Sequence, residues 1–137
     1  IPRSVLPAAF AGQRCYSTAV FFLLQKGERS LFHRLASEEV WHFYLGGPLR
    51  LVQLGLEGVA ETFLLGQDAA AGQKLQHVVP AGTWFGAFPE PSSDYSFVGA
   101  TVAPGFDFAD FELARRDDLL KKFPAAADCI KQLTEPG

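Results

Sequence analysis

The sequence predicts an all-β fold, a sandwich, jelly roll or barrel of eight short strands, with a helical tail at its C-terminal end. Short apolar, aromatic and β-branched runs recur at near-regular spacing as far as residue 103. Turns rich in Gly, Pro and Asp separate these runs. Beyond residue 111, charged and apolar residues recur at helical spacing instead. We therefore expect a β domain that is followed by helices.

The turn signals mark where the predicted strands begin and end. A Lys-Gly pair at 26–27 follows the first strand, a Pro-Ala-Gly run at 80–82 precedes the seventh, and the segment 89–94 precedes the eighth. The predicted strands span residues 18–24, 31–35, 40–45, 49–54, 60–65, 75–79, 83–88 and 95–102.

The tail is predicted to form two helices, 111–122 and 125–133, which a proline separates. No internal repeat, low-complexity segment or linker interrupts the chain. We expect a single domain over residues 1–137, with strands over about 17–104 and a helical tail over about 111–134.

Composition limits the classes of function. The 137 residues are 48% hydrophobic and 20% charged, which is typical of a globular protein. A net charge of -3, with no Lys or Arg run longer than a pair, argues against a nucleic-acid partner. No apolar stretch approaches the roughly 20 residues that span a bilayer, so we expect a soluble protein without a membrane partner. Cys15 and Cys129 lack a metal or redox spacing, which favours free thiols and the cytoplasm.

The stretch from Gly27 to Gly46 carries the most specific pattern. Five residues separate Gly27 from His33, three separate Leu35 from Glu39, and six separate Glu39 from Gly46. This spacing resembles the first metal-binding motif of the cupin barrels, Gly-(five)-His-x-His-(three)-Glu-(six)-Gly. The chain departs from the motif at one position, because Leu35 replaces the second histidine.

A second departure lies in the segment Pro80-Ala-Gly-Thr-Trp-Phe85, which resembles the core of the second cupin motif, Pro-x-Gly-x-x-His. Phe85 replaces the histidine there, so only His33 and Glu39 remain of the four usual ligands. Catalytic zinc normally keeps three protein ligands, and non-haem iron needs two histidines and a carboxylate. We therefore expect no cofactor, with a divalent metal held by His33 and Glu39 as the alternative.

Sequence blocks over residues 17–114 are similar to the small single-domain cupin family of largely uncharacterised function, within the double-stranded β-helix superfamily. The blocks are STAVFFLL, SLFHRLASEEVWHFYLGGPL, VVPAGTWFGA and VGATVAPGFDFADFELA. The resemblance implies a jelly-roll barrel, commonly dimeric, with an interior pocket open to solvent, but no established reaction. Related chains usually carry a further segment ahead of Arg3, and if it contributes to the pocket or the dimer, the site of this chain is incomplete.

Strand alternation decides which side chains share the interior. If Glu39 faces inward, His33 is its natural partner, because a charge inside an apolar barrel is costly unless it is paired. The set expected to point inward is His33 with Leu35, and Glu39 with Trp41 and Phe43. His42 and Tyr44 then point outward, to a second apolar layer or a subunit interface, and we expect a homodimer.

These residues predict a site for a small molecule. We expect His33 and Glu39 to be catalytic, with His33 as a general base beside a carbonyl and Glu39 setting its tautomer. By analogy with metal-free cupin epimerases, the predicted activity is a metal-independent isomerase, epimerase or lyase acting on a sugar-like or carbonyl-containing metabolite. The residues expected to contact the ligand are Leu35, Trp41, Phe43, His77, Phe85 and Asp107.

Other interpretations stay open, including whether the chain is an enzyme at all. A non-catalytic binding or sensing module would use the same pocket, and a metal-dependent oxygenase would need a metal. His33 and Glu39 could be a buried pair without function, and His77 a core histidine.

After the last strand, Phe106, Phe108 and Phe111 are expected to cover the open end of the barrel. Asp107 and Asp110 are expected to cap the following helix, with Asp107 at the pocket rim as the functional alternative.

Overall fold

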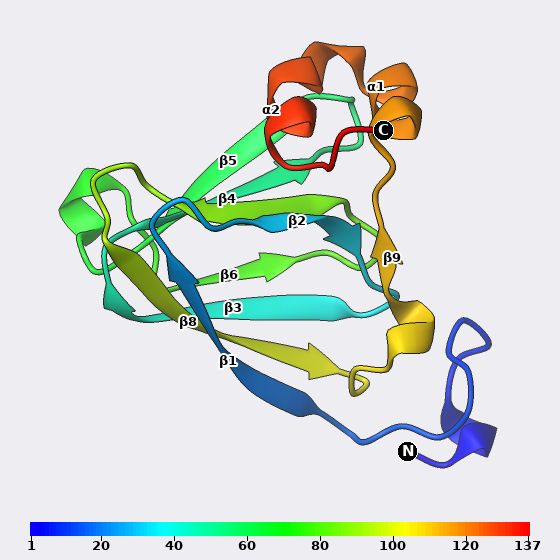
Figure 1. Cartoon of the computed structure of the whole chain (residues 1–137). Coiled ribbons are helices and arrows are strands. Elements are labelled where there is room, and N and C mark those ends of the chain that lie inside the picture. The colour runs from blue at the N-terminus through cyan, green and yellow to red at the C-terminus, as the bar shows by residue number, and fades with distance from the viewer.

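The computed structural model describes residues 1–137 and consists mainly of two antiparallel β-sheets (Figure 1). The first sheet has the order β1 (Thr18–Gln25), β8 (Tyr95–Ala103), β3 (Glu38–Gly46) and β6 (Gln76–Val79). The second has the order β5 (Ala60–Leu65), β4 (Leu49–Leu54), β7 (Phe85–Pro89), β2 (Ser30–Arg34) and β9 (Glu112–Leu113). The predicted all-β jelly-roll class is confirmed.

All eight predicted strands are confirmed, with ends that differ by two residues at most. The predicted helix 111–122 is wrong in its first part. Residues 112–113 pair with β2 as β9, so α1 begins only at Arg116 and spans Arg116–Lys122. The second helix, α2, spans Ala127–Gln132. Short 3-10 turns are η1 (Arg3–Val5), η2 (Ala69–Ala71), η3 (Phe108–Asp110) and η4 (Pro124–Ala126).

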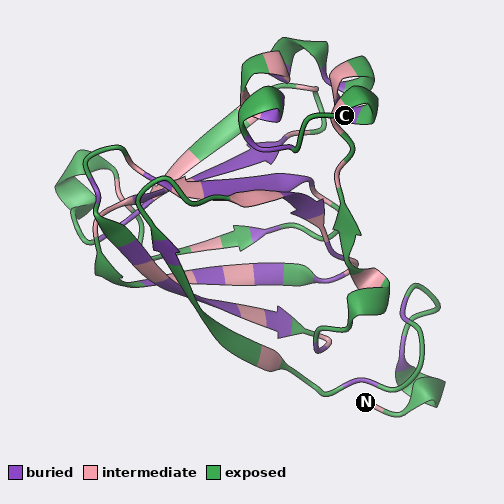
Figure 2. Ribbon diagram, viewed as in Figure 1, coloured by how far each residue is buried: buried purple, intermediate pink, exposed green.

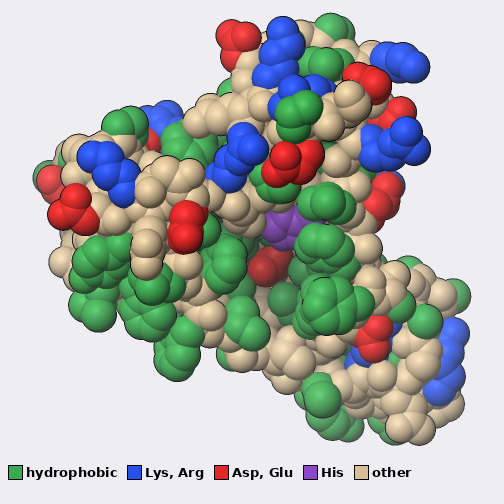
Figure 3. Space-filling view, viewed as in Figure 1, with side chains coloured by type: hydrophobic (Ala, Val, Ile, Leu, Met, Phe, Trp, Pro, Cys, Tyr) green, Lys and Arg blue, Asp and Glu red, His purple; other side chains and the backbone are tan.

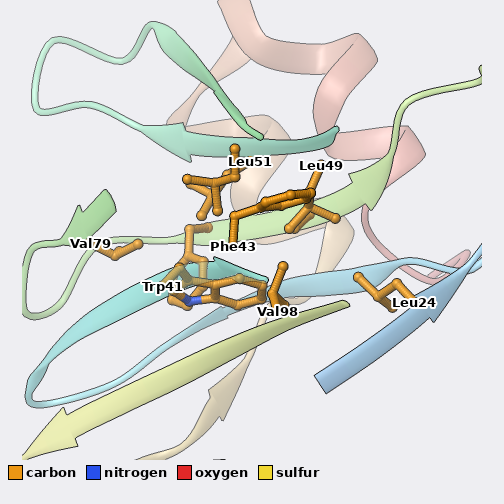
Figure 4. Close-up of a cluster of buried hydrophobic side chains, with 10 residues drawn as sticks. Leu24, Trp41, Phe43, Leu49, Leu51, Val79 and Val98 are labelled. Atoms are coloured by element: carbon orange, nitrogen blue, oxygen red, sulfur yellow. The ribbon is translucent and has the colours of Figure 1, made fainter. Parts of the chain in front are cut away.

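Two hydrophobic cores hold the layers together. The first lies between the two sheets, where side chains such as Phe43 from β3 and Leu51 from β4 meet (Figure 4). The second lies between the outer face of the β5-β4-β7-β2-β9 sheet and the C-terminal helices, and joins Phe32 of β2 to Ile130 of α2. Both of these side chains are fully buried. The helices therefore cover one sheet and leave the other sheet's outer face free (Figures 1 and 2).

The uncovered outer face carries aromatic side chains. Phe21, Tyr44 and Phe97 form a surface cluster with ring centroids 5.4 to 5.9 Å apart. Phe21 is 75% exposed. Hydrophobic side chains gather over this part of the molecule in Figure 3. His42 also points outward, as the alternation predicts, and its Nε2 lies 3.0 Å from the hydroxyl of Thr101. No helix has the length and apolar character needed to cross a membrane.

Candidate functional site

A cavity of about 830 Å³ lies on the inner side of β1, between the two sheets. Its walls come from β1, β2, β3 and β8, and its mouth from the segment 106–113. In Figure 3 a hollow opens on this face, with a histidine at its floor and hydrophobic side chains around it. Twelve of the sixteen lining residues are hydrophobic, and the polar ones are Thr18, Ser30, His33 and Glu39.

His33 presents one free ring nitrogen to this cavity. Its Nδ1 lies 2.8 Å from the carbonyl oxygen of Leu31, and a carbonyl can only accept, so Nδ1 carries the proton. In the neutral ring Nε2 then has an unprotonated lone pair. Nε2 makes no hydrogen bond to the protein and is not sealed from solvent. The ring packs between Phe85, with centroids 4.2 Å apart, and Phe111, at 5.3 Å.

Burial sets the protonation state of this histidine. It lowers the pKa of His33 below its usual value of 6.5, and the hydrogen bond to the Leu31 carbonyl offsets only part of that fall. The imidazole is therefore neutral at pH 7. A neutral imidazole with a free Nε2 in an apolar cavity can act as a general base.

Glu39 lies on β3, in the sheet that does not contain His33, lines the same cavity and is 8% exposed. Burial raises its pKa from 4.5 to about 7, and the nearby indole N–H of Trp41 offsets part of the rise. Neither Glu39 Oε2 nor Trp41 Nε1 has a hydrogen-bond partner in the protein. Glu39 therefore titrates near neutral pH and can donate or accept a proton there.

The predicted pairing of His33 with Glu39 is wrong. No hydrogen bond or ion pair joins them, although both line the same cavity. The reason is topological, because β2 and β3 follow one another in sequence but belong to different sheets. A backbone carbonyl, not a carboxylate, sets the tautomer of His33. The two groups therefore reach the same cavity from different sheets.

The other predicted contact residues fall into different places. Leu35 and Trp41 line the cavity. Phe43 and Phe85 do not; they lie in the core between the sheets, with Phe85 packed behind His33. Asp107 is exposed and caps η3, where its carboxylate accepts from the Ala109 N–H at 2.8 Å.

His77 points inward but on the far side of Phe85. In the second sheet Phe85 stands between His33 and Gln53, since it is paired with both. The Nε2–H of His77 donates to Oε1 of Gln53 at 2.9 Å, and its ring stacks on Phe63 at 4.0 Å. These contacts satisfy His77 within the protein, away from the cavity.

The mouth of the cavity is formed by residues for which strand alternation offers no signal. Phe106, Phe108 and Phe111 line the mouth, which agrees with the prediction that they cover the open end of the barrel. Asp110 does not cap a helix as predicted; it accepts two hydrogen bonds from the guanidinium of Arg14, including Nη2 to Oδ1 at 2.9 Å. Both side chains of this pair are nearly inaccessible to solvent. The N-terminal segment and β9 thus hold the aromatic mouth in place.

Comparison with known proteins assigns the chain to a family. The family model described as Cupin superfamily (DUF985) matches residues 3–114. The chain belongs to this cupin family. A solved Shewanella oneidensis structure is 38% identical, covers 95% of this cupin and 82% of its own chain, and superposes with a TM-score of 0.86. A hypothetical protein from Leishmania major is 31% identical, with 90% and 78% covered and a TM-score of 0.83.

An uncharacterized protein of Saccharomyces cerevisiae is 29% identical over 112 residues, which are 79% of this cupin. The cupin spans only 55% of the length of that yeast protein. A dTDP sugar isomerase from Desulfovibrio desulfuricans superposes with a TM-score of 0.63 at 13% identity, covering 82% of the cupin and 73% of its own chain. At that identity the likeness shows the fold alone.

The donor set of this cupin does not fit the metal centre that its motifs resemble. No group of three or more His, Cys, Asp and Glu side chains lies together to hold an ion. At the two substituted positions, the Leu35 side chain lines the cavity and the Phe85 ring packs at a tilt against His33. His33 and Glu39 are too few for a catalytic zinc or a non-haem iron. We therefore derive no chemical step through a metal.

Glu39 should give the stability of this cupin a pH dependence that Glu39→Gln removes. Below pH 4.5 the carboxyl is protonated in the folded and unfolded states and has no effect. Between pH 4.5 and about 7 the unfolded chain ionises this carboxyl while the folded protein keeps it protonated, so stability is lost over this range and the loss levels off above it. A pKa raised from 4.5 to about 7 corresponds to a loss of about 3 kcal/mol in the free energy of unfolding. Urea denaturation between pH 4 and about pH 9 measures it.

The control is Glu38→Gln, which changes the exposed neighbour of Glu39 on the same strand. The stability of wild type relative to Glu39→Gln should fall across this window, whereas relative to Glu38→Gln it should stay level. A constant difference between wild type and Glu39→Gln at every pH would show that Glu39 has no raised pKa.

Proposed function

We propose that this cupin binds a small carbonyl-containing metabolite in the cavity and catalyses a metal-independent proton transfer on it, as an isomerase, epimerase or lyase. One observation carries the proposal. His33 has its Nδ1 fixed on a backbone carbonyl and its Nε2 free, inside a mainly apolar cavity that also holds a protonatable Glu39. A base and an acid that line one cavity, with no hydrogen bond between them, suit proton transfer on a bound molecule.

The proposed reaction begins when His33 Nε2 removes a proton from the carbon next to the carbonyl. The electron pair of that C–H bond moves into the C–C bond, and the carbonyl oxygen becomes an enolate or, on taking a proton from Glu39, an enol. Where the deprotonated carbon carries a hydroxyl group, the intermediate is an enediol; a proton then returns to the former carbonyl carbon, the hydroxyl loses its proton as the new carbonyl forms, and the product is an isomer. Return of a proton to the opposite face of the deprotonated carbon gives an epimer. Loss of a leaving group from the next carbon gives a lyase product. None of these outcomes needs an oxidant or reductant.

The cavity walls suit an apolar carbonyl compound better than a sugar-like one. A sugar presents many hydroxyl groups, each of which needs a hydrogen-bond partner when it is buried. Apart from the indole N–H of Trp41, polar side-chain groups come only from Thr18, Ser30, His33 and Glu39, whereas twelve lining residues are hydrophobic. We therefore propose a carbonyl compound with a largely apolar or aromatic body rather than a sugar-like substrate.

The experiment is hydrogen–deuterium exchange at the carbon next to a ketone, followed by proton NMR in D2O. Aryl ketones such as 2-acetylnaphthalene and 1-tetralone serve as probes, because they match the apolar walls and carry exchangeable protons beside the carbonyl. If the protein makes hydrogen–deuterium exchange in the ketone faster than it is in buffer alone, the proposed enzymatic activity is supported. If these ketones bind but never exchange faster than in buffer, the protein is a non-catalytic binding module and the proposed reaction fails.

We also propose that the molecule forms a homodimer through the outer face of the β1-β8-β3-β6 sheet. A second copy is the occupant that this face suits, because its central positions carry no Lys, Arg, Asp or Glu. Those positions are Ala19, Phe21, Leu23, Val40, His42, Tyr44, Phe97, Gly99 and Thr101. Exposed apolar patches of this kind mark interaction surfaces. β1 also pairs only with β8, so its other edge is free to pair with a second copy.

Phe21→Lys is expected to convert the dimer into a monomer, because two copies would bring buried lysines against each other's aromatic rings. Sedimentation velocity measures the change in mass. The control is Leu56→Lys, which replaces a fully exposed apolar residue in the turn between β4 and β5 and should leave the dimer intact. A wild-type protein that stays monomeric at every concentration, or an unchanged dimer in Phe21→Lys, would refute this interface.

A further inference from the structure

Two buried polar atoms beside the cavity have no partner in the protein, Oε2 of Glu39 and Nε1 of Trp41. Glu39 is 8% exposed and Trp41 only 2%. Folded proteins leave few buried polar atoms unsatisfied, and each one calls for an explanation. Both of these residues line the same cavity. A molecule bound in that cavity would supply the missing partner for both.

Glu39 Oε2 and Trp41 Nε1 lie on the same face of β3 and can bind the same ligand atom. Glu39 and Trp41 are two residues apart on β3, so their side chains leave the same face of the strand. The indole N–H is close enough to the carboxyl to favour its ionised form, yet no hydrogen bond joins them. A gap between a donor and a carboxyl on one strand face is a position that a single ligand atom can occupy.

The indole is held rigidly in this position. Its ring packs edge-on against Phe85, with centroids 5.8 Å apart and planes at 87°, and edge-on against Phe22, at 6.1 Å and 88°. These contacts from two different sheets fix the direction of the N–H bond before any ligand arrives. Donors that are oriented in advance stabilise charge without reorganising, which is why they are effective in active sites.

We propose that Trp41 Nε1–H and the Glu39 carboxyl together bind one oxygen atom of the substrate, the carbonyl oxygen that becomes the enolate oxygen. The indole N–H can only donate, and a protonated carboxyl donates as well, so the atom between them must be an acceptor. This inference rests on the proposed function and names Trp41 as a catalytic residue for it. His33 acts on the carbon from one sheet, and the two donors act on the oxygen from the other sheet.

The test compares two ligands that differ by one atom. In 2-acetylnaphthalene the side group ends in a carbonyl oxygen, and in 2-isopropenylnaphthalene a CH₂ group replaces that oxygen at nearly the same shape. Isothermal titration calorimetry of the full chain gives both dissociation constants. We expect the ketone to bind at least about tenfold more tightly, in line with buried donors that only the ketone can satisfy. The C=O stretch of the bound ketone should also shift to lower frequency.

Matched variants assign that preference to the two groups. Trp41→Phe keeps an aromatic ring but removes the N–H, and Glu39→Leu removes the carboxyl; each should lower the preference for the ketone severalfold and reverse part of the frequency shift. Glu39→Gln keeps an N–H donor and should retain most of the preference. Trp84→Phe changes the other tryptophan, which packs under Arg34 away from the cavity, and should change neither quantity.

The outcomes separate this inference from the proposed function. If both ligands bind wild type equally, or if Trp41→Phe and Glu39→Leu leave the ketone preference and the C=O frequency unchanged, the oxygen site is refuted while the cavity remains a ligand site. If neither ligand binds, the cavity fails as a site for apolar carbonyl compounds, and the inference fails with it. A ketone preference that depends on both groups, with rescue by Glu39→Gln, supports it.

Discussion

His33→Gln is expected to lower the rate of ketone exchange by about 10²- to 10⁴-fold, the range that general-base catalysis contributes. Glutamine can keep the hydrogen bond to the Leu31 carbonyl through its amide N–H, but it has no basic nitrogen. The affinity for 2-acetylnaphthalene should change only severalfold, because the aromatic walls around Phe85 and Phe111 remain. Exchange rates are measured by proton NMR at several ketone concentrations. They give kcat and KM separately, and so distinguish a loss of catalysis from a loss of binding.

The matched control is His42→Gln. His42 lies on β3 but points to the outer face, with Nε2 on the Thr101 hydroxyl. His77→Gln is a second control, because that ring faces Gln53 behind Phe85. Both variants should exchange ketones like wild type. Equal exchange by wild type and His33→Gln would remove His33 from the reaction and leave the cavity as a binding site.

Leu35→His combined with Phe85→His should create a tight site for a divalent metal ion where wild type has none. The two substitutions restore the histidines that the cupin motifs contain. Together with His33 and Glu39 they offer four ligands, and catalytic zinc needs only three. The Leu35 side chain lines the cavity, and the Phe85 ring lies against His33, so both new imidazoles begin close to the existing pair. Affinity for Zn²⁺ or Ni²⁺ should rise by roughly 100-fold or more.

The gain in metal affinity should come with a loss of stability. Phe85 is 1% exposed and packs in the core between the sheets, so a smaller polar ring there costs about 2 to 4 kcal/mol in the metal-free protein. Zn²⁺ should restore part of it, because an ion that binds only the folded state stabilises that state. Adding both His33→Ala and Glu39→Leu to the double variant leaves only two ligands, so this control should abolish the gain. A double variant that binds Zn²⁺ no better than wild type would mean that the backbone no longer keeps the metal geometry.

The arrangement along β3 could be predicted from sequence because the two-residue period of a strand holds whatever surrounds it. Glu39, Trp41 and Phe43 are buried, while His42 and Tyr44 face outward. The eight strands were predictable for the same reason, since each combines β-type residues with a clear turn signal. The cupin motif followed from the spacing of Gly27, His33, Glu39 and Gly46, and the family followed from the sequence blocks over residues 17–114.

The contacts that define the site depend on tertiary structure and could not be predicted in this way. β2 and β3 are neighbours in sequence, but the chain crosses between sheets after Arg34, so His33 and Glu39 line one cavity from two sheets and are not paired along a ladder. Glu112 and Leu113 fit a helical pattern, yet they pair with a strand far upstream. The part played by Arg14 at the mouth also depends on a distant partner, Asp110, that no spacing rule connects to it.

In the proposed reaction, this cupin carries out proton transfer with its own side chains and without a bound metal. The most direct measurement is the rate of exchange at the carbon beside the carbonyl of 2-acetylnaphthalene after exhaustive treatment with EDTA, with iron, nickel, manganese and zinc determined on the same sample. The account predicts exchange well above the buffer rate in protein that holds far less than one metal ion per chain. Exchange that disappears with EDTA and returns with one equivalent of a divalent metal would contradict it.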